Sequence, residues 1–119
     1  MKRILNIIIP FILLTATTSA QKPQLRFHDG DFKIMQLTDL HLINRGDYKA
    51  LRDSTYNLIR VLIDTEKPDM VVLTGDCVIW CDAEGSWKEL SDVFVEKETP
   101  FSVTFGNHDE ETDWDNARI

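Results

Sequence analysis

Cysteine is scarce in this chain of 119 residues, which has only two, Cys77 and Cys81. Two cysteines are too few to hold a small domain together through disulfides. Their C-x3-C spacing differs from the C-x-x-C of thiol redox proteins, and no second pair accompanies them to complete a structural zinc site. A redox or zinc-binding module is therefore a minor alternative, while a strained disulfide between the two stays open.

Basic residues are also in the minority. Thirteen lysines and arginines face 20 aspartates and glutamates, so the formal net charge is −7. An acidic surface repels nucleic-acid phosphates and anionic membranes, and we expect no nucleic-acid binding. Acidic side chains can instead gather around divalent cations. The chain has no internal repeat and no low-complexity segment.

The one long apolar run, residues 4–14, follows Lys2 and Arg3 and precedes small residues at 18–20. This order is typical of a secretory signal peptide, which we place at residues 1–20. The run is shorter than the roughly 20 residues of a membrane span, so we expect no stable membrane anchor, with an uncleaved anchor as the minor alternative. We therefore expect an exported protein, periplasmic or extracellular, with a mature part of residues 21–119. Without Lys2 and Arg3 its charge becomes −7 − 2 = −9.

Apolar periodicity in the mature part predicts an α/β fold. A hairpin signal at Asp29-Gly30 separates two apolar segments, and Asp47 and Ser86 stand where they could cap helices. Strands that alternate with helices favour β-α-β-α-β units with a mainly parallel sheet. The predicted strands are residues 25–28, 32–38, 70–73 and 101–105, and the predicted helices are 47–66 and 86–97.

Three of these strands end in polar motifs: "DLH" at 39–41, "GD" at 75–76 and "GNHD" at 106–109. The carboxyl ends of parallel strands share one edge of a sheet, so we expect the three loops to converge. Carboxylate, amide and imidazole groups suit divalent Mn, Fe or Zn. Two such ions, bridged by a carboxylate, can clamp a phosphate for in-line attack. The groups in question belong to Asp39, His41, Asp76, Asn107 and His108.

The three motifs together resemble the opening motifs of the calcineurin-like metallophosphoesterases, in the branch related to purple acid phosphatases. The resemblance implies a four-layer α/β/β/α sandwich, two divalent metal ions and a phosphoester substrate. It assigns Asp39 and His41 to one metal, Asp76 to the bridge and Asn107 to the other metal. It makes His108 the catalytic acid or charge stabiliser and Asp109 the residue that orients it. The rest of the acidic run, 110–111, we expect to be mostly solvated.

The chain also departs from that family. The family's pattern continues with a further histidine and a G-H-x-H motif, but no histidine follows His108 here. We therefore expect residues 21–119 to be the N-terminal portion of a metallophosphoesterase domain, truncated on its C-terminal side, with weak metal binding and little activity alone. The alternative is a non-catalytic remnant. Ile79 stands where purple acid phosphatases have an iron-binding tyrosine, so the resemblance implies no tyrosinate–iron centre. The class of phosphoester stays open.

Overall fold

A computed structural model describes residues 25–114, so the predicted signal peptide lies outside the described residues. Three strands alternate with two helices, and short 3-10 turns η1 and η2 precede α1 and follow β3. The elements are β1 (Ile34–Leu37), η1 (Gly46–Tyr48), α1 (Lys49–Glu66), β2 (Met70–Thr74), α2 (Ala83–Glu96), β3 (Phe101–Thr104) and η2 (Asp109–Glu111). The expected α/β class is confirmed.

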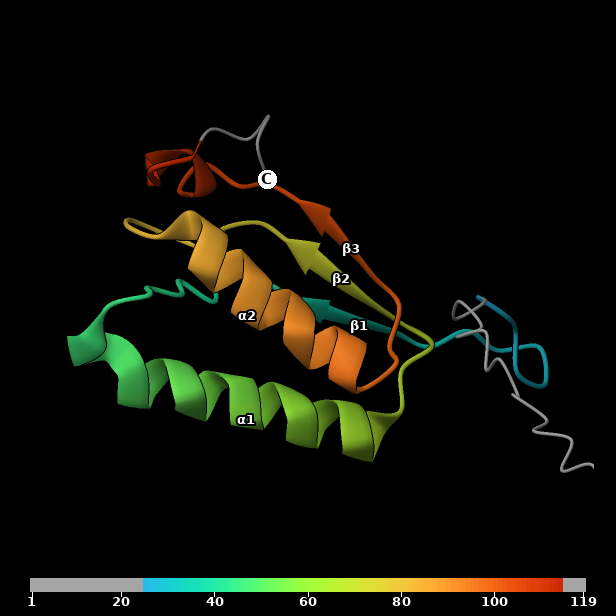
Figure 1. Cartoon of the computed structure of the whole chain (residues 1–119). Helices are drawn as coiled ribbons and strands as arrows, with labels where there is room; N and C mark the ends of the chain where they lie inside the picture. Colours follow the sequence, from blue (N-terminus) through green and yellow to red (C-terminus); the bar gives the residue numbers. More distant parts are fainter. Residues whose placement is uncertain (1–24, 115–119) are drawn as a thin grey trace, which may run out of the picture.

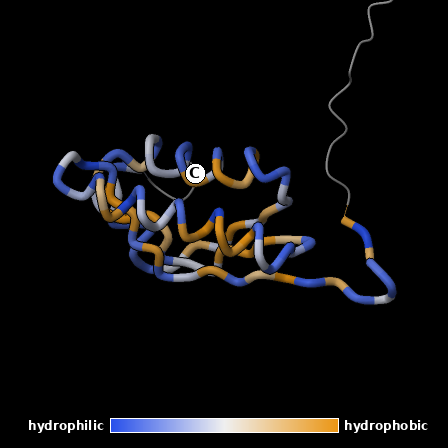
Figure 2. Tube along the Cα trace, turned by 90° about the horizontal axis from the view of Figure 1, so that it is seen from below, coloured by the Kyte–Doolittle hydropathy of each residue, from blue (hydrophilic) through white to orange (hydrophobic). Residues whose placement is uncertain are grey.

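The strands form one parallel sheet in the order β1-β2-β3, with both helices packed on the same face (Figure 1). Val71 and Leu73 of the central strand point toward the helices and are fully buried, as are Leu90 and Phe94 of α2. Each such side chain contributes about 1.5–3 kcal/mol through the hydrophobic effect. Hydrophobic stretches gather around the strands, while the helices alternate between hydrophobic and hydrophilic turns (Figure 2). The hydrophobic core therefore lies between the sheet and the two helices, and it holds the paired strands in place.

The opposite face of the sheet carries the alternate strand residues. Ile34 is 56% exposed, and the Gln36 side chain donates a hydrogen bond to the Thr74 hydroxyl at 3.0 Å. Within residues 25–114, no helix or second sheet covers this face. The described residues thus form one helical layer and one sheet layer of the four that the resemblance implies.

The strands predicted at 32–38, 70–73 and 101–105 differ from the observed ones by one or two residues at an end, and three other predictions differ more in kind. The predicted strand at 25–28 is only a single antiparallel bridge between His28 and Asp31. Helix α1 begins at Lys49, after a 3-10 turn, and Asp47 does not cap it. Helix α2 begins at Ala83, three residues before the predicted capping box.

The reason for the earlier start of α2 is its cap. The Asp82 carboxylate accepts the Gly85 N–H at 3.1 Å, which satisfies one of the free amides of the first turn. Ser86 is instead fully buried inside the helix. None of the described helices is both long and apolar enough to cross a membrane.

Candidate metal centre

The three strand ends meet at one edge of the sheet, on the side to which the arrowheads in Figure 1 point. Backbone hydrogen bonds join the loop after β1 to the loop after β2. Asp39 donates its N–H to the Gly75 carbonyl at 3.0 Å, and His41 donates to the Asp76 carbonyl at 3.0 Å. A bridge between Leu42 and Val78 continues this pairing. The first two polar motifs are therefore held side by side by main-chain contacts.

Two glycines allow the third loop to approach closely. A Cβ placed on Gly75, whose φ is +107°, would lie 2.9 Å from the Gly106 Cα. A Cβ on Gly106 would lie 2.2 Å from the Asp76 Oδ1. Both distances are well inside van der Waals contact, so a side chain at either position would push the loops apart. Glycine at 106 in particular leaves the room that the Asp76 carboxylate occupies.

Asp39, His41 and Asp76 form a cluster of possible metal ligands. One ligand atom from each lies within 4.8 Å of the others. All three residues have positive φ, between 47° and 54°, which is uncommon for residues other than glycine. Strained backbone of this kind persists where the surrounding structure enforces it, often at functional sites. Two carboxylates and an imidazole fit one divalent ion of the Mn, Fe or Zn type.

Asp109 has contacts that the resemblance did not imply. It is fully buried, and its carboxylate accepts four backbone N–H groups. Oδ2 takes those of Asp76 at 2.8 Å and Gly106 at 2.7 Å. Oδ1 takes those of Cys77 at 3.1 Å and Val78 at 3.2 Å. These bonds lock the second and third loops together. The orientation of His108 by Asp109 stays a prediction.

His108 lies beside the ligand cluster. Its ring meets the ring of His41 edge to face, with 5.7 Å between the two centroids. The backbone N–H of His108 donates a hydrogen bond to the Asp76 Oδ1 at 2.9 Å. The partner of its imidazole is Glu111, with 2.9 Å between Nδ1 and Oε1. This hydrogen bond and the negative charge of Glu111 raise the pKa of His108 above its ordinary value. The Glu111 side chain is 63% exposed, as expected for the acidic run. Its contact with His108 was not predicted, although the i+3 spacing of the two residues was a usable signal.

The remaining residues singled out in the sequence occupy varied environments. Asn107, the expected ligand of the second metal, is exposed on the third loop. Cys77 is fully buried, and burial raises its thiol pKa to about 12, whereas Cys81 is partly exposed. Both cysteines are free thiols. Trp80, on the second loop, is 52% exposed beneath the Arg45 guanidinium, 4.6 Å from its ring centroid.

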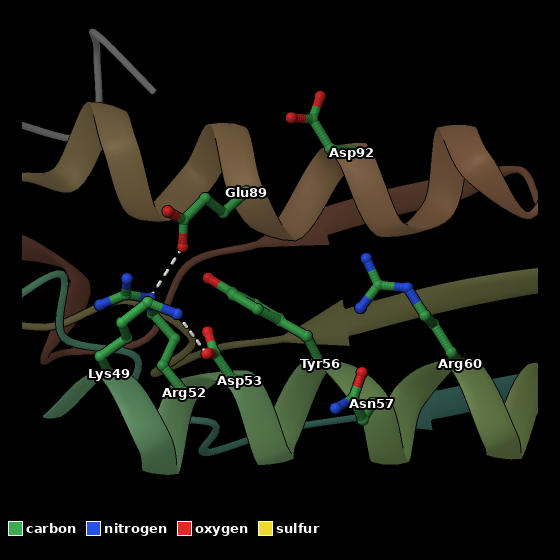
Figure 3. A pocket seen from close by; sticks show the side chains of 8 residues that line it. All are labelled: Lys49, Arg52, Asp53, Tyr56, Asn57, Arg60, Glu89 and Asp92. Atoms are coloured by element: carbon green, nitrogen blue, oxygen red, sulfur yellow. Dashed lines mark hydrogen bonds and ion pairs between the residues drawn. The ribbon is translucent and has the colours of Figure 1, made fainter.

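A polar groove of about 500 Å³ lies elsewhere, between α1 and α2 (Figure 3). Every charged side chain that lines it forms an ion pair, although Arg60 and Asp92 pair with residues outside the groove. Arg52, which is 8% exposed, forms a 2.8 Å ion pair with Glu89, and Lys49 pairs with Asp53. Burial raises the pKa of Tyr56 well above its ordinary value, so its hydroxyl stays protonated. Because these charges are mutually compensated, the groove has no marked attraction for an ion of either sign.

The fold and the site thus define an α/β protein with a candidate metal site, formed by two carboxylates and an imidazole at the carboxyl edge of a parallel sheet. Residues 32–118 match the family model of the calcineurin-like phosphoesterases. The chain belongs to this family, and the resemblance read from its motifs is confirmed. No solved structure matched the chain.

Relatives support the same assignment. A probable inactive purple acid phosphatase 29 of Arabidopsis thaliana is 29% identical over 85% of this chain and 30% of its own length. Phosphatase DCR2 of Saccharomyces cerevisiae is 30% identical over 86% of this chain and 20% of its own length. The uncharacterized metallophosphoesterase YkuE of Bacillus subtilis is 31% identical over 82% of this chain and 33% of its own length. The chain thus spans about a third or less of these proteins.

Proposed function

We propose that this protein is a phosphoester hydrolase with a dinuclear metal centre, and that residues 21–119 contribute the first half of its ligand set. The observation that carries this proposal is the convergence of Asp39, His41 and Asp76, with ligand atoms within 4.8 Å of one another. Family membership supports divalent metal use and a phosphoester substrate. Family membership does not give the number of ions, their identity, the class of phosphoester or the reaction of this chain. These points are part of what we propose.

Each residue has a role in this scheme. Asp39 and His41 would hold one ion, Asp76 would bridge, and the exposed Asn107 would reach the second. Bound ions would offset the charge of the phosphoryl oxygens and assist the attack of water on phosphorus. His108, beside the cluster, would give a proton to the leaving oxygen.

A second candidate is a non-catalytic member of the same family that binds metal weakly. Two observations favour it. Three of the relatives are named as probably inactive, at 29%, 32% and 33% identity. Only three acidic or imidazole ligands gather at the site within the described residues. The two candidates differ in metal affinity and in turnover, so both can be measured.

The test is a calorimetric titration of the chain with Mn²⁺ and with Zn²⁺, followed by p-nitrophenyl phosphate turnover. The Asp76→Asn variant should lose at least about tenfold in affinity, which equals roughly 1.4 kcal/mol. Asp92→Asn, which makes the same charge change on the exposed surface of α2, should bind like the unaltered chain. Equal affinity of the Asp76→Asn variant and the unaltered chain would refute the site. Turnover that needs Mn²⁺ or Zn²⁺ and is lost in Asp76→Asn would favour the hydrolase over the non-catalytic candidate.

We also propose that the protein is exported, as the predicted signal peptide at 1–20 indicates. Fractionation of cells that express the whole chain would test this. Export should be accompanied by removal of the leader before Gln21, seen as a mass loss in the mature protein. Retention of the uncut chain in the cytosol would refute the proposal.

A further inference from the structure

We propose that Glu111 is a positioning residue for His108. Its carboxylate holds the imidazole through Nδ1, so that Nε2 is the nitrogen left to face the substrate. The role of Nε2 toward a substrate rests on the proposed hydrolase function, whereas the hydrogen bond between Nδ1 and Glu111 does not. Both side chains remain in contact with solvent, His108 at 42% and Glu111 at 63% exposure, so the geometry of the hydrogen bond carries the proposal and burial does not.

The local backbone sets this contact. His108 directly precedes η2, and the Glu111 N–H donates to the His108 carbonyl at 3.1 Å. One short helical turn therefore places residue 111 above residue 108. The Glu111 Oε1 then lies 2.9 Å from the His108 Nδ1, which is hydrogen-bond distance for an N–H donor and a carboxylate.

Neighbouring carboxylates are engaged elsewhere. Asp109 gives both oxygens to four backbone amides, and the Asp76 Oδ1 receives the backbone N–H of His108 rather than its ring. The ring of His41 packs edge to face on the same imidazole, at 5.7 Å. Glu111 and His41 together thus restrict how the His108 ring can rotate about its side-chain bonds.

The chemical consequence concerns which nitrogen exchanges a proton. A neutral imidazole that donates through Nδ1 keeps its lone pair on Nε2. When the ring is protonated, Nε2 carries the second proton and can pass it to the leaving oxygen of a phosphoester. The ring then returns to the neutral form, with its Nδ1 proton still bonded to Glu111. Hydrogen-bonded carboxylates fix the tautomer of metal-ligating histidines in the same way.

The tautomer can be read directly from long-range proton–nitrogen NMR spectra of the metal-free full chain. The chain has only three histidines, at 28, 41 and 108, which keeps the spectrum simple. The spectra are recorded at a pH of about 9, well above the reference histidine pKa of about 6.5. His108 should show the Nδ1–H form. His28 should show the Nε2–H form, because its Nε2 lies 3.1 Å from Asp69.

Variants separate contact from charge. Glu111→Ala should shift His108 to the Nε2–H form or to a mixture. Glu111→Gln, which keeps a side-chain oxygen as acceptor, should retain the Nδ1–H form. Glu110→Ala removes the same charge one residue away and should leave the His108 spectrum unchanged. An Nε2–H tautomer of His108 in the unaltered chain, or an Nδ1–H tautomer that persists unchanged after Glu111→Ala, would overturn the proposal.

This measurement needs neither metal nor turnover. A chain that fails to bind Mn²⁺ but shows the Nδ1–H tautomer would refute the hydrolase proposal and keep the hold of Glu111 on Nδ1. A chain that binds Mn²⁺ but shows the Nε2–H tautomer of His108 would support the metal site and refute the positioning role of Glu111.

Discussion

Replacing Asp109 by alanine is the most direct test of how the site is assembled. The carboxylate is fully buried and accepts backbone N–H groups from two loops that lie more than 25 residues apart in the sequence. The four donors belong to Asp76, Cys77, Val78 and Gly106, at 2.7–3.2 Å. Alanine cannot accept any of these hydrogen bonds, so the amides lose their shared acceptor.

The magnitude follows from the cost of unpaired donors. A buried N–H group without an acceptor costs about 1–3 kcal/mol, and an acceptor that carries a charge raises the loss. Four donors are affected, but they share one acceptor and the loops can relax toward water, so the costs do not add fully. We expect Asp109→Ala to lower the free energy of unfolding by about 3–6 kcal/mol. The free energy of unfolding of a typical domain is about 5–15 kcal/mol in total, so the variant should be close to unfolding.

The assay is urea unfolding of the chain, followed by far-ultraviolet circular dichroism. Asp109→Ala should show a large fall in the urea midpoint, or no folded baseline at all. Asp92→Ala is the control, because Asp92 is an exposed carboxylate on α2 that pairs with Lys88, and its midpoint should be essentially unchanged. A loss below about 1 kcal/mol in Asp109→Ala would show that the four hydrogen bonds do not hold the loops together.

Two further predictions concern residues near the same loops. Gly106→Ala should reduce Mn²⁺ affinity at least about tenfold, because the added Cβ would lie 2.2 Å from a ligand carboxylate, and titration calorimetry would measure the loss. Affinity equal to that of the unaltered chain would contradict the close approach. Cys77, fully buried and with a thiol pKa of about 12, should resist a thiol reagent at a pH of about 8 until urea unfolds the chain, while the partly exposed Cys81 reacts at once. Two fast-reacting thiols in the folded chain would refute the burial of Cys77.

The three strands of the sheet were predictable because their residue types strongly favour extended backbone. The run from Met70 to Leu73 is apolar and rich in β-branched side chains, and the observed strand differs from it by a single residue. Helix starts were harder to predict. Asp82 and Ser86 are both good capping residues by type, and only the burial of Ser86 against the core decides between them.

Residue roles were predictable only where the motif itself carries the chemistry. Asp39, His41 and Asp76 were named from their places after strands, and the structure brings them together. Asp109 shows the limit of such reasoning. A buried carboxylate and a catalytic one look alike in a sequence, because three of the four amides that Asp109 binds lie about 30 residues away.

The sequence by itself determined the class of the fold, the family and the types of donor atom at the candidate site. Those properties follow from local apolar patterns and from short motifs, which need no knowledge of distant contacts. The tertiary structure alone decided which side chains serve which partner. Parallel pairing of the strands places Asp109 under the second loop, and one helical turn places Glu111 on His108. These partners are set by distances in space, which sequence spacing does not encode.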